Sequence, residues 1–332
     1  MTQQTALVLG ATGGIGGEVA RRLQARGWHV RALHRAPQVG AGGLDWIKGD
    51  ALSSVDVARA AEGASLLVHG VNPPGYRNWG GLVLPMLDNT IAAAKRHGAR
   101  ILLPGTVYNF GPEAFPLIDE DAPQRPLTRK GHIRVEMEKR LERAAEAGEA
   151  RALVVRAGDF FGPRAANNWF SQGLVKPGRP LRSITYPGRP GVGHQWAYLP
   201  DVAETMVRLV EQDLPDFARF HMNGHWDEDG TRMIEAICRA AERSDLPVRR
   251  LPWRLLALAA PFNETLREMR EMRYLWQRPV RLDNARLRAT LGEEPRTPLD
   301  QAVRETLRGL GCLPDPVKAA RPVQAARLAD ER

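Results

Sequence analysis

The sequence predicts an α/β fold: a doubly wound parallel sheet, followed by a smaller, mostly helical and loop-rich C-terminal lobe. Short apolar strand patterns alternate with helix patterns from residue 6 to residue 156. The first strand pattern leads into a glycine-rich turn and then a helix. After residue 163 the alternation stops, and residues 164–196 are rich in Gly, Pro and Arg. Strands that alternate with helices are typical of a parallel sheet covered on both faces.

The glycine-rich turn joins a buried strand over residues 6–9 to a helix over 14–26. Gly10, Gly13 and Gly16 have the spacing G-x-x-G-x-x-G. Gly10 suits a sharp turn, Gly13 lets the backbone approach a phosphate, and Gly16 lets the helix pack closely on the strand. The amides at the helix N-terminus point at an anion. This context predicts a Rossmann-type NAD(P) site, whose residues in the turn are Gly10, Thr12, Gly13, Gly14, Ile15 and Gly16.

The second strand, over residues 30–33, ends in His34 and Arg35. An acidic side chain at this position would bind a ribose hydroxyl and favour NAD. An arginine instead matches a 2′-phosphate, since its planar fork pairs with phosphate oxygens. We therefore predict that the protein binds NADP in preference to NAD. The alternative is that Arg35 is only a surface charge.

Two further turns follow at the same predicted edge of the sheet. Asp50 and Ala51 end the strand pattern that contains Trp46, and we expect them near the adenine. After a helix over 53–61 and a strand over 65–69, Asn72 lies in a turn. Ligands bind at the carboxyl ends of such strands. Asn72 therefore contacts ribose or nicotinamide, or else caps the turn.

The remaining elements complete the predicted domain of residues 1–163. A helix over 81–97 precedes a strand over 100–104 that ends in the turn of Thr106 and Tyr108. A long helix over about 128–147 and a strand over 152–156 follow.

Residues 164–311 form the predicted substrate-binding lobe, from which residues 196–223 return to the main body. That returning segment includes a helix capped by Asp201 and a strand near 219–222. We expect further helices over 231–243 and 252–310, and a poorly ordered tail over 312–332, which contains several prolines.

Composition excludes several other functional classes. The net charge is +9, but arginines often stand beside glutamates, as in residues 267–273, which is typical of a solvated helix face. We predict no nucleic-acid partner and, without a long apolar run, no membrane span. The first strand starts by residue 6, which leaves no room for a signal peptide, and the two cysteines are expected to be unpaired, so a cytoplasmic protein is expected. No Cys/His cluster has metal-ligand spacing, so no metal is predicted.

Together these motifs resemble the extended short-chain dehydrogenase/reductase superfamily, of the NAD-dependent epimerase/dehydratase type. The resemblance covers roughly residues 5–310. Besides the glycines it includes Gly49-Asp50, the Thr106-Val-Tyr108 turn, residues 156–163 and residues 196–203. It implies a cofactor lobe followed by a smaller substrate lobe, a small-molecule substrate, and a homodimer built from two long helices.

The sequence departs from this family where catalysis is expected. The family has Tyr-x-x-x-Lys at the start of the long helix, where the tyrosine transfers a proton and the lysine holds the nicotinamide ribose. Here Lys130 takes the tyrosine position and Arg134 the lysine position. The family's Ser/Thr, which binds the substrate carbonyl, corresponds to Thr106. The resemblance also places residues close to Asp159 near the nicotinamide, and His194 and Trp196 beside the substrate cleft.

Three explanations of the missing tyrosine stay open. Lys130 transfers the proton itself, with a pKa lowered by Arg134 and by burial. Alternatively, Tyr108 donates the proton from the neighbouring turn. In the third case the site binds the cofactor without chemistry. The sequence thus predicts an NADP-dependent oxidoreductase or epimerase-like enzyme for a small carbonyl or alcohol, with Thr106, Tyr108, Lys130 and Arg134 as catalytic residues. A non-catalytic NADP-binding redox sensor or regulatory protein is the alternative.

Overall fold

A seven-stranded parallel sheet forms the centre of the protein. The computed structural model describes residues 3–37, 41–73, 78–165, 168–262 and 264–314. All neighbouring strands of the sheet run parallel. From one edge to the other the strands are β11 (Phe217–His221), β7 (Arg151–Arg156), β5 (Arg100–Gly105), β4 (Leu66–His69), β1 (Thr5–Leu9), β2 (His29–His34) and β3 (Asp45–Lys48).

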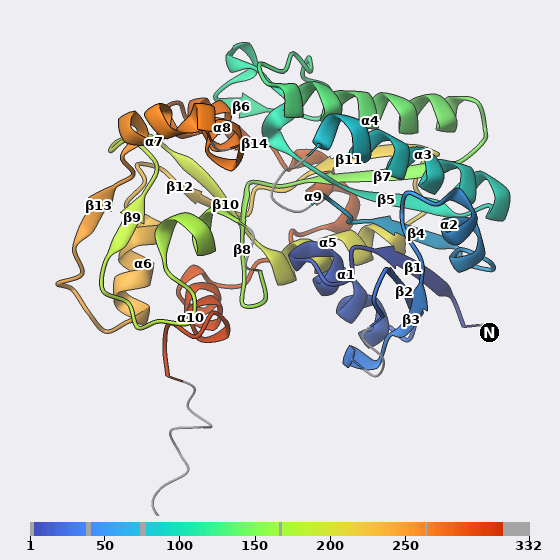
Figure 1. The fold of residues 1–332 in the computed structure, drawn as a ribbon, viewed down its shortest axis with the longest axis horizontal. Coiled ribbons are helices and arrows are strands. Elements are labelled where there is room, and N and C mark those ends of the chain that lie inside the picture. The colour runs from blue at the N-terminus through green and yellow to red at the C-terminus, as the bar shows by residue number, and fades with distance from the viewer. Residues whose placement is uncertain (1–2, 38–40, 74–77, 166–167, 263, 315–332) are drawn as a thin grey trace, which may run out of the picture.

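Helices cover both faces of this sheet, which confirms the predicted doubly wound fold (Figure 1). Side chains alternate along each strand: Ala6 and Val8 enter the core beneath one face, and Leu7 and Leu9 enter the core beneath the other. Burial on both sides explains why these strands read as continuous apolar runs. The first face carries α1 (Gly14–Ala25), α5 (Leu199–Val210) and α9 (Ala285–Leu291); the second carries α2 (Ser54–Ala60), α3 (Trp79–His97) and α4 (Arg129–Glu146).

Local signals fix where the helices begin and end. The Ser53 hydroxyl accepts a hydrogen bond from the Asp56 amide at 3.2 Å and caps α2. The Thr128 hydroxyl accepts from the Gly131 amide at 3.0 Å and caps α4. Gly98 ends α3 with φ +66°, the left-handed conformation that glycine adopts without strain. The Thr128 cap thus sets the start of α4, two residues before Lys130.

The C-terminal part contains strands as well as the predicted helices and loops (Figure 1). The sequence pattern did not show these strands, which are only two to five residues long. The five-residue strand His194–Tyr198 is buried along its whole length and so shows no alternation. The sheets are β12 (His225–Asp227), β10 (His194–Tyr198) and β8 (Asp159–Phe161); β13 (Val248–Arg250) and β9 (Ile184–Tyr186); and β14 (Arg281–Leu282) and β6 (Leu117–Ile118).

The helices of this part surround an aromatic core. Trp196 and Trp276 are almost fully buried and lie 5.8 Å apart between ring centroids. The longer helices are α6 (Arg232–Ala240), α7 (Trp253–Ala259), α8 (Glu264–Glu271) and α10 (Leu299–Gly309).

Short helical turns also occur along the whole chain, at Ala41–Gly43, Val107–Asn109, Pro112–Ala114, Phe170–Leu174, Ala260–Phe262 and Met272–Trp276.

The start of the predicted tail is packed into the protein. Cys312 is only 4% exposed and lies in the aromatic core, so an ordered segment extends beyond Gly311. Residues 315–332 lie outside the described residues. Cys238 and Cys312 are both free thiols, as the sequence predicted. No helix in the described part of the chain is both long and apolar enough to cross a bilayer.

Asp201 does not cap α5, contrary to the prediction. Pro200 stands at the start of the helix, a position that proline favours, so Asp201 falls inside the first turn. Its carboxylate instead accepts hydrogen bonds from the Thr297 amide and hydroxyl, both at 2.7 Å. Burial raises the pKa of Asp201. The residue ties α5 to the segment that leads into α10.

Three buried histidines are held neutral. Burial, with a smaller contribution from Arg134, lowers the pKa of His69 to about 3. Burial lowers the pKa of His225 to about 4. Burial and the nearby Arg156 charge lower the pKa of His221 well below its ordinary value. His69 Nδ1 lies 2.8 Å from the hydroxyl of Thr90. Since that hydroxyl donates to the carbonyl of residue 86 at 3.0 Å, His69 Nδ1 carries the proton.

Because the pKa values of these histidines are lowered in the folded state, we expect the protein to lose stability in mild acid. The unfolded chain binds a proton at each histidine near pH 6.5, whereas folded His69 does so only near pH 3, so stability falls as pH drops through this window. His69→Asn keeps a donor for Thr90 and removes the titration. The free energy of unfolding, measured by urea denaturation, should then fall between pH 7 and pH 5 by about 2 kcal/mol less than in the wild type. An equal fall in His69→Asn and in the exposed control His132→Asn would contradict this.

Candidate functional site

Gly10, Gly16 and Gly70 meet at the point where the strand order of the sheet reverses. β1 lies between β4 and β2, and the loops that leave β1 and β4 touch. A Cβ on Gly10 would lie 2.5 Å from the carbonyl oxygen of Gly70, and one on Gly16 would lie 2.3 Å from the carbonyl oxygen of Gly10. Gly10 also has φ +91°. Only glycine fits at these two positions, and ligands of open α/β sheets bind at this crevice.

The N-terminus of α1 faces the same crevice. Gly13 is the N-cap, no side chain caps the helix, and its first turn holds no acidic residue. The Gly13 amide donates to the Gly10 carbonyl at 2.9 Å, which closes the turn. The amides of the first helical turn and the helix dipole together favour a negatively charged group at this place.

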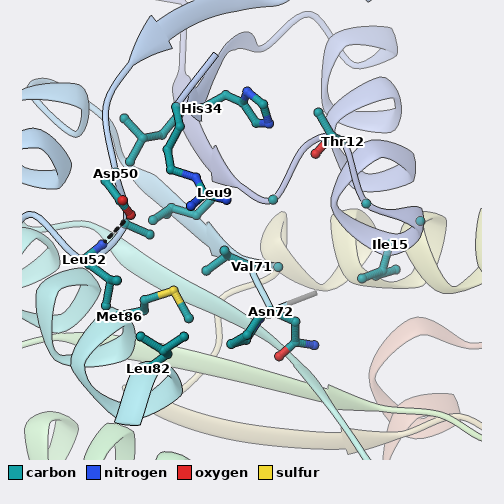
Figure 2. Close-up of a pocket in the computed structure, with 18 of the residues that line it drawn as sticks. Leu9, Thr12, Ile15, His34, Asp50, Leu52, Val71, Asn72, Leu82 and Met86 are labelled. Atoms are coloured by element: carbon teal, nitrogen blue, oxygen red, sulfur yellow. Dashed lines mark hydrogen bonds between the residues drawn. The ribbon is translucent and has the colours of Figure 1, made fainter. Parts of the chain in front are cut away.

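An outer cleft of about 470 Å³ opens beside this turn (Figure 2). Figure 2 shows Thr12 and Ile15 on one side of it and Leu82 and Met86, from α3, on the other. Gly16, which the sequence also predicted as a cofactor residue, does not line the cleft and packs against the backbone of Gly10 instead. The predicted cofactor residues that line the cleft are Gly10, Thr12, Gly13, Gly14, Ile15, Arg35, Asp50, Ala51 and Asn72.

Arg35 stands where the outer cleft continues into an open groove. This groove is lined by Arg35 and by Lys48, Asp50, Asp56 and Arg59. Arg59 is engaged by the Asp56 carboxylate and the Lys48 carbonyl, both at 3.0 Å. Arg35 and Lys48 are exposed side chains at the ends of adjacent parallel strands. Sequence reasoning missed Lys48, because an isolated lysine at a strand end reads as a surface charge.

Asp50 shapes the loop that closes this end of the cleft. Its carboxylate accepts a hydrogen bond from the Leu52 amide at 3.0 Å (Figure 2). Its own amide donates to the Asp56 carboxylate at 3.1 Å. Asn72 is exposed at the other end. It lines the outer cleft and also a second, inner cavity.

The inner cavity, of about 170 Å³, holds all four predicted catalytic residues. It shares Asn72, Pro73, Phe160 and Asn168 with the outer cleft, so the two spaces adjoin. The other residues that line it are Trp79, Thr106, Tyr108, Lys130, Arg134, Asp159, Trp169, Gln172, Met269 and Met272. Sequence reasoning missed Gln172 and the two methionines, which come from segments that no motif marks.

A chain of buried hydrogen bonds holds Thr106 at the cavity wall. Its hydroxyl donates to Asn109 Oδ1 at 3.2 Å and accepts from the Tyr108 amide at 3.3 Å. The Asn109 amide group donates in turn to Glu138 Oε1 at 2.9 Å. Glu138 forms an ion pair with Arg156, which is fully buried. The network therefore links the β5 turn, α4 and β7 behind the cavity.

Lys130 and Arg134 bring two cations into the inner cavity. They lie one turn apart on α4 and are only 2% and 8% exposed. The Arg134 guanidinium donates to the carbonyl of Pro104 at 3.4 Å and to Asn72 Oδ1 at 3.5 Å. It also lies 5.2 Å from the ring centroid of Trp79. Within the described residues, no group of three or more metal-ligating side chains is present.

Comparison with known proteins identifies relatives at the level of family and fold. The family model described as "NAD dependent epimerase/dehydratase family" matches residues 6–220. No curated protein sequence matches the chain. The sequence alone resembled the same family, which this match confirms.

Solved structures share the fold at low identity. MoeE5 in complex with UDP-glucuronic acid and NAD is 17% identical, with a TM-score of 0.72 over 92% of this chain and 98% of that chain. UDP-glucose 4-epimerase from Bifidobacterium longum, in complex with NAD+ and UDP, is 15% identical, with a TM-score of 0.72 over 93% and 100%. UDP-glucose 4-epimerase from Thermus thermophilus, in complex with NAD, is 19% identical, with a TM-score of 0.70 over 92% and 99%.

The glycine contact predicts a costly substitution. Gly16→Ala places a methyl group against the Gly10 backbone, so it should lower the free energy of unfolding by about 1–3 kcal/mol. Gly80→Ala on α3 is the matched control, because its added Cβ meets no atom within 4 Å. Urea denaturation of both variants tests this. Equal stability of Gly16→Ala and the wild type would show that α1 moves away from β1 without cost.

Proposed function

The chain belongs to the NAD-dependent epimerase/dehydratase family, and on that premise we propose that it is an NADP-dependent oxidoreductase or epimerase-like enzyme for a small carbonyl or alcohol. The observation that carries the proposal is the junction of the two spaces. A cleft built for a dinucleotide adjoins a cavity that contains Thr106, Lys130 and Arg134. In this proposal residues 1–163 bind the cofactor and residues 164–311 contribute most of the substrate lobe.

The residues present fit a nicotinamide dinucleotide. The glycine turn leaves space that a Cβ would fill, and the N-terminus of α1 favours an anion. Three of the structural neighbours are complexes with NAD, and Arg35 and Lys48 favour a 2′-phosphate in addition. A guanidinium and an ammonium that line the same groove suit a phosphate dianion better than they suit a ribose hydroxyl. When bound, the dinucleotide supplies or accepts the hydride.

The chain's own residues position and polarise the substrate. The Thr106 hydroxyl donates to Asn109 in this structure, and in the proposal it turns from Asn109 to donate to the carbonyl oxygen of the substrate. Lys130 donates the proton to that oxygen in reduction and takes it back in oxidation. Arg134 stabilises negative charge where the cleft and the cavity meet. We favour Lys130 over Tyr108 because Lys130 is nearly buried at the cavity, whereas Tyr108 is partly exposed.

The size of the inner cavity supports a small substrate. At about 170 Å³ it is smaller than the roughly 300–1,000 Å³ of pockets for drug-sized ligands. Trp169, Met269 and Met272 contribute apolar walls, and Gln172 contributes a polar one. Water exclusion by such walls strengthens the interactions of Lys130 and Arg134 with a bound oxygen.

The choice of cofactor can be tested by nucleotide binding. NADPH should bind the wild type more tightly than NADH does. Arg35→Ala should weaken NADPH binding roughly 10- to 100-fold, the effect of losing a charge-assisted hydrogen bond, with little change for NADH. Lys48→Ala should have a smaller effect in the same direction. Nucleotide fluorescence titrations measure these affinities.

Arg143→Ala serves as the control, because Arg143 is an exposed residue of α4 that pairs with Glu136 away from both spaces. Equal affinity for NADH and NADPH, unchanged in Arg35→Ala, would contradict the 2′-phosphate assignment. If neither NADH nor NADPH binds, the proposed function itself is contradicted.

The source of the proton that reaches the carbonyl oxygen can be tested by substitution of Lys130. Lys130→Met should lower kcat for the reduction of a carbonyl substrate roughly 10²- to 10⁴-fold. Its affinity for NADPH should stay within a few-fold of the wild-type affinity. Tyr108→Phe should keep most of the activity. Steady-state kinetics with a panel of small carbonyl compounds measures turnover, and nucleotide titration of the same variants measures NADPH binding. Full activity in Lys130→Met would remove Lys130 from the mechanism, and wild-type binding of NADPH without any turnover would favour a redox sensor.

A further inference from the structure

Large apolar side chains are exposed at one place in the C-terminal part. Leu255 and Leu258 on α7 are 65% and 74% exposed, and Val248 on β13 is 50% exposed. Residues three apart on a helix lie side by side on one face, so the two leucines are neighbours. Single exposed leucines are ordinary on a protein surface, whereas neighbouring ones form an apolar patch of the kind that contacts a partner or a lipid.

Arginines accompany these apolar side chains without acidic neighbours in the sequence. Residues 246–263 contain Arg249, Arg250 and Arg254 and no Asp or Glu. All three arginines are exposed, and none of them forms an ion pair within the described residues. This short segment therefore supplies three of the nine net positive charges of the chain.

The charged and the apolar side chains lie close together. Arg254 stands four residues before Leu258, so the two are neighbours on the helix surface. Only two residues separate β13 from α7, which keeps the arginines of β13 near the helix. Figure 1 shows β13 and α7 near one end of the longest axis of the molecule. The members of this patch, called the α7 surface below, are Val248, Arg249, Arg250, Arg254, Leu255 and Leu258.

We propose that the α7 surface docks on an anionic lipid bilayer. The leucines enter the boundary between headgroups and acyl chains, and the arginines contact lipid phosphates, as in helices that lie in the membrane plane. The long apolar stem of arginine keeps its guanidinium at the headgroups while the leucines insert. The seven residues of α7 extend about 10 Å, against a hydrocarbon core of roughly 30 Å, so α7 lies on the bilayer and does not cross it. This inference does not depend on the proposed function.

Other occupants fit the α7 surface less well. A second copy of the chain, paired about a two-fold axis, would bring three arginines of each copy to one interface, where like charges repel. An acidic protein would satisfy the arginines, but protein interfaces require matched shapes around side chains that project as far as Leu255 and Leu258 do. Fluid lipid closes around projecting side chains without a preformed pocket, and its phosphates complement the arginines.

Co-sedimentation of the full chain with lipid vesicles tests the requirement for anionic lipid. Each arginine at an anionic surface strengthens binding roughly fivefold. Vesicles of equal parts phosphatidylcholine and phosphatidylglycerol should therefore bind the protein roughly 10-fold or more tightly than vesicles of phosphatidylcholine alone. High salt should weaken this binding, because it screens the headgroup charge. Equal binding to both kinds of vesicle, or no binding to the anionic ones, would overturn the inference.

The apolar contribution is tested by a double variant, Leu255→Gln with Leu258→Gln, which should bind the anionic vesicles roughly 10-fold more weakly. Leu117→Gln with Leu127→Gln is the matched control, since these leucines are 55% and 59% exposed elsewhere on the protein. Urea denaturation of both variants checks that they stay folded. Wild-type binding by the α7 variant, or an equal loss in the control, would reduce the effect to adsorption of a basic protein and overturn the inference.

The charge contribution is tested by replacing the three arginines of the α7 surface together with Gln, which should weaken binding roughly 10-fold or more. The matched control replaces three exposed arginines of α3, α9 and α10 with Gln: Arg96, Arg288 and Arg308. This control should change binding less than about threefold, because its charges lie away from the docked face. Equal losses in the two triple variants would show that only net charge matters and would overturn the inference.

Sedimentation equilibrium without lipid tests the second copy as the occupant. We expect the wild type and Leu255→Gln with Leu258→Gln to have the same oligomeric state. A dimer that is lost in this double variant, together with a failure to bind anionic vesicles, would overturn the lipid assignment and identify a second copy of the chain on the α7 surface.

Discussion

The contact between α1 and β1 is the constraint from which the rest of the site follows. A Cβ at Gly16 would approach the Gly10 carbonyl to 2.3 Å, and one at Gly10 would approach Gly70 to 2.5 Å. The helix therefore rests on the strand at the distance that only glycine allows. This brings the N-terminal amides of α1 to the crevice beside β4, where a parallel sheet exposes its carboxyl ends. The outer cleft exists because these three backbone segments meet.

A second constraint lies behind the inner cavity. The buried Glu138–Arg156 pair joins α4 to β7, and Asn109 carries the same network to Thr106. The Thr128 cap fixes the start of α4 two residues before Lys130. Together these contacts orient Thr106, which we propose polarises an oxygen, and Lys130, which we propose supplies a proton. A buried ion pair adds little to stability by itself, so its value here is in fixing positions.

The sequence predicted those features whose signal is local. Alternating strands and helices predicted the parallel sheet, the glycine spacing predicted the turn, and the helix pattern placed Lys130 and Arg134 on one face. It did not predict the short strands outside the central sheet, such as Asp159–Phe161 and His194–Tyr198, because three to five residues are too few to show a clear alternation. It also placed Asp201 at a cap, although Pro200 starts that helix earlier. The pairing of Asp159 with His194 depends on strand register over 35 residues, which no local pattern records.

The most direct test of this account is a crystal structure of the protein with NADPH. The central claim is that the outer cleft and the inner cavity form one site. The account predicts that the 2′-phosphate lies between Arg35 and Lys48, and that the nicotinamide lies at the residues common to both spaces, Asn72, Phe160 and Asn168. A nicotinamide directed to solvent, with the inner cavity closed off from it, would contradict the claim.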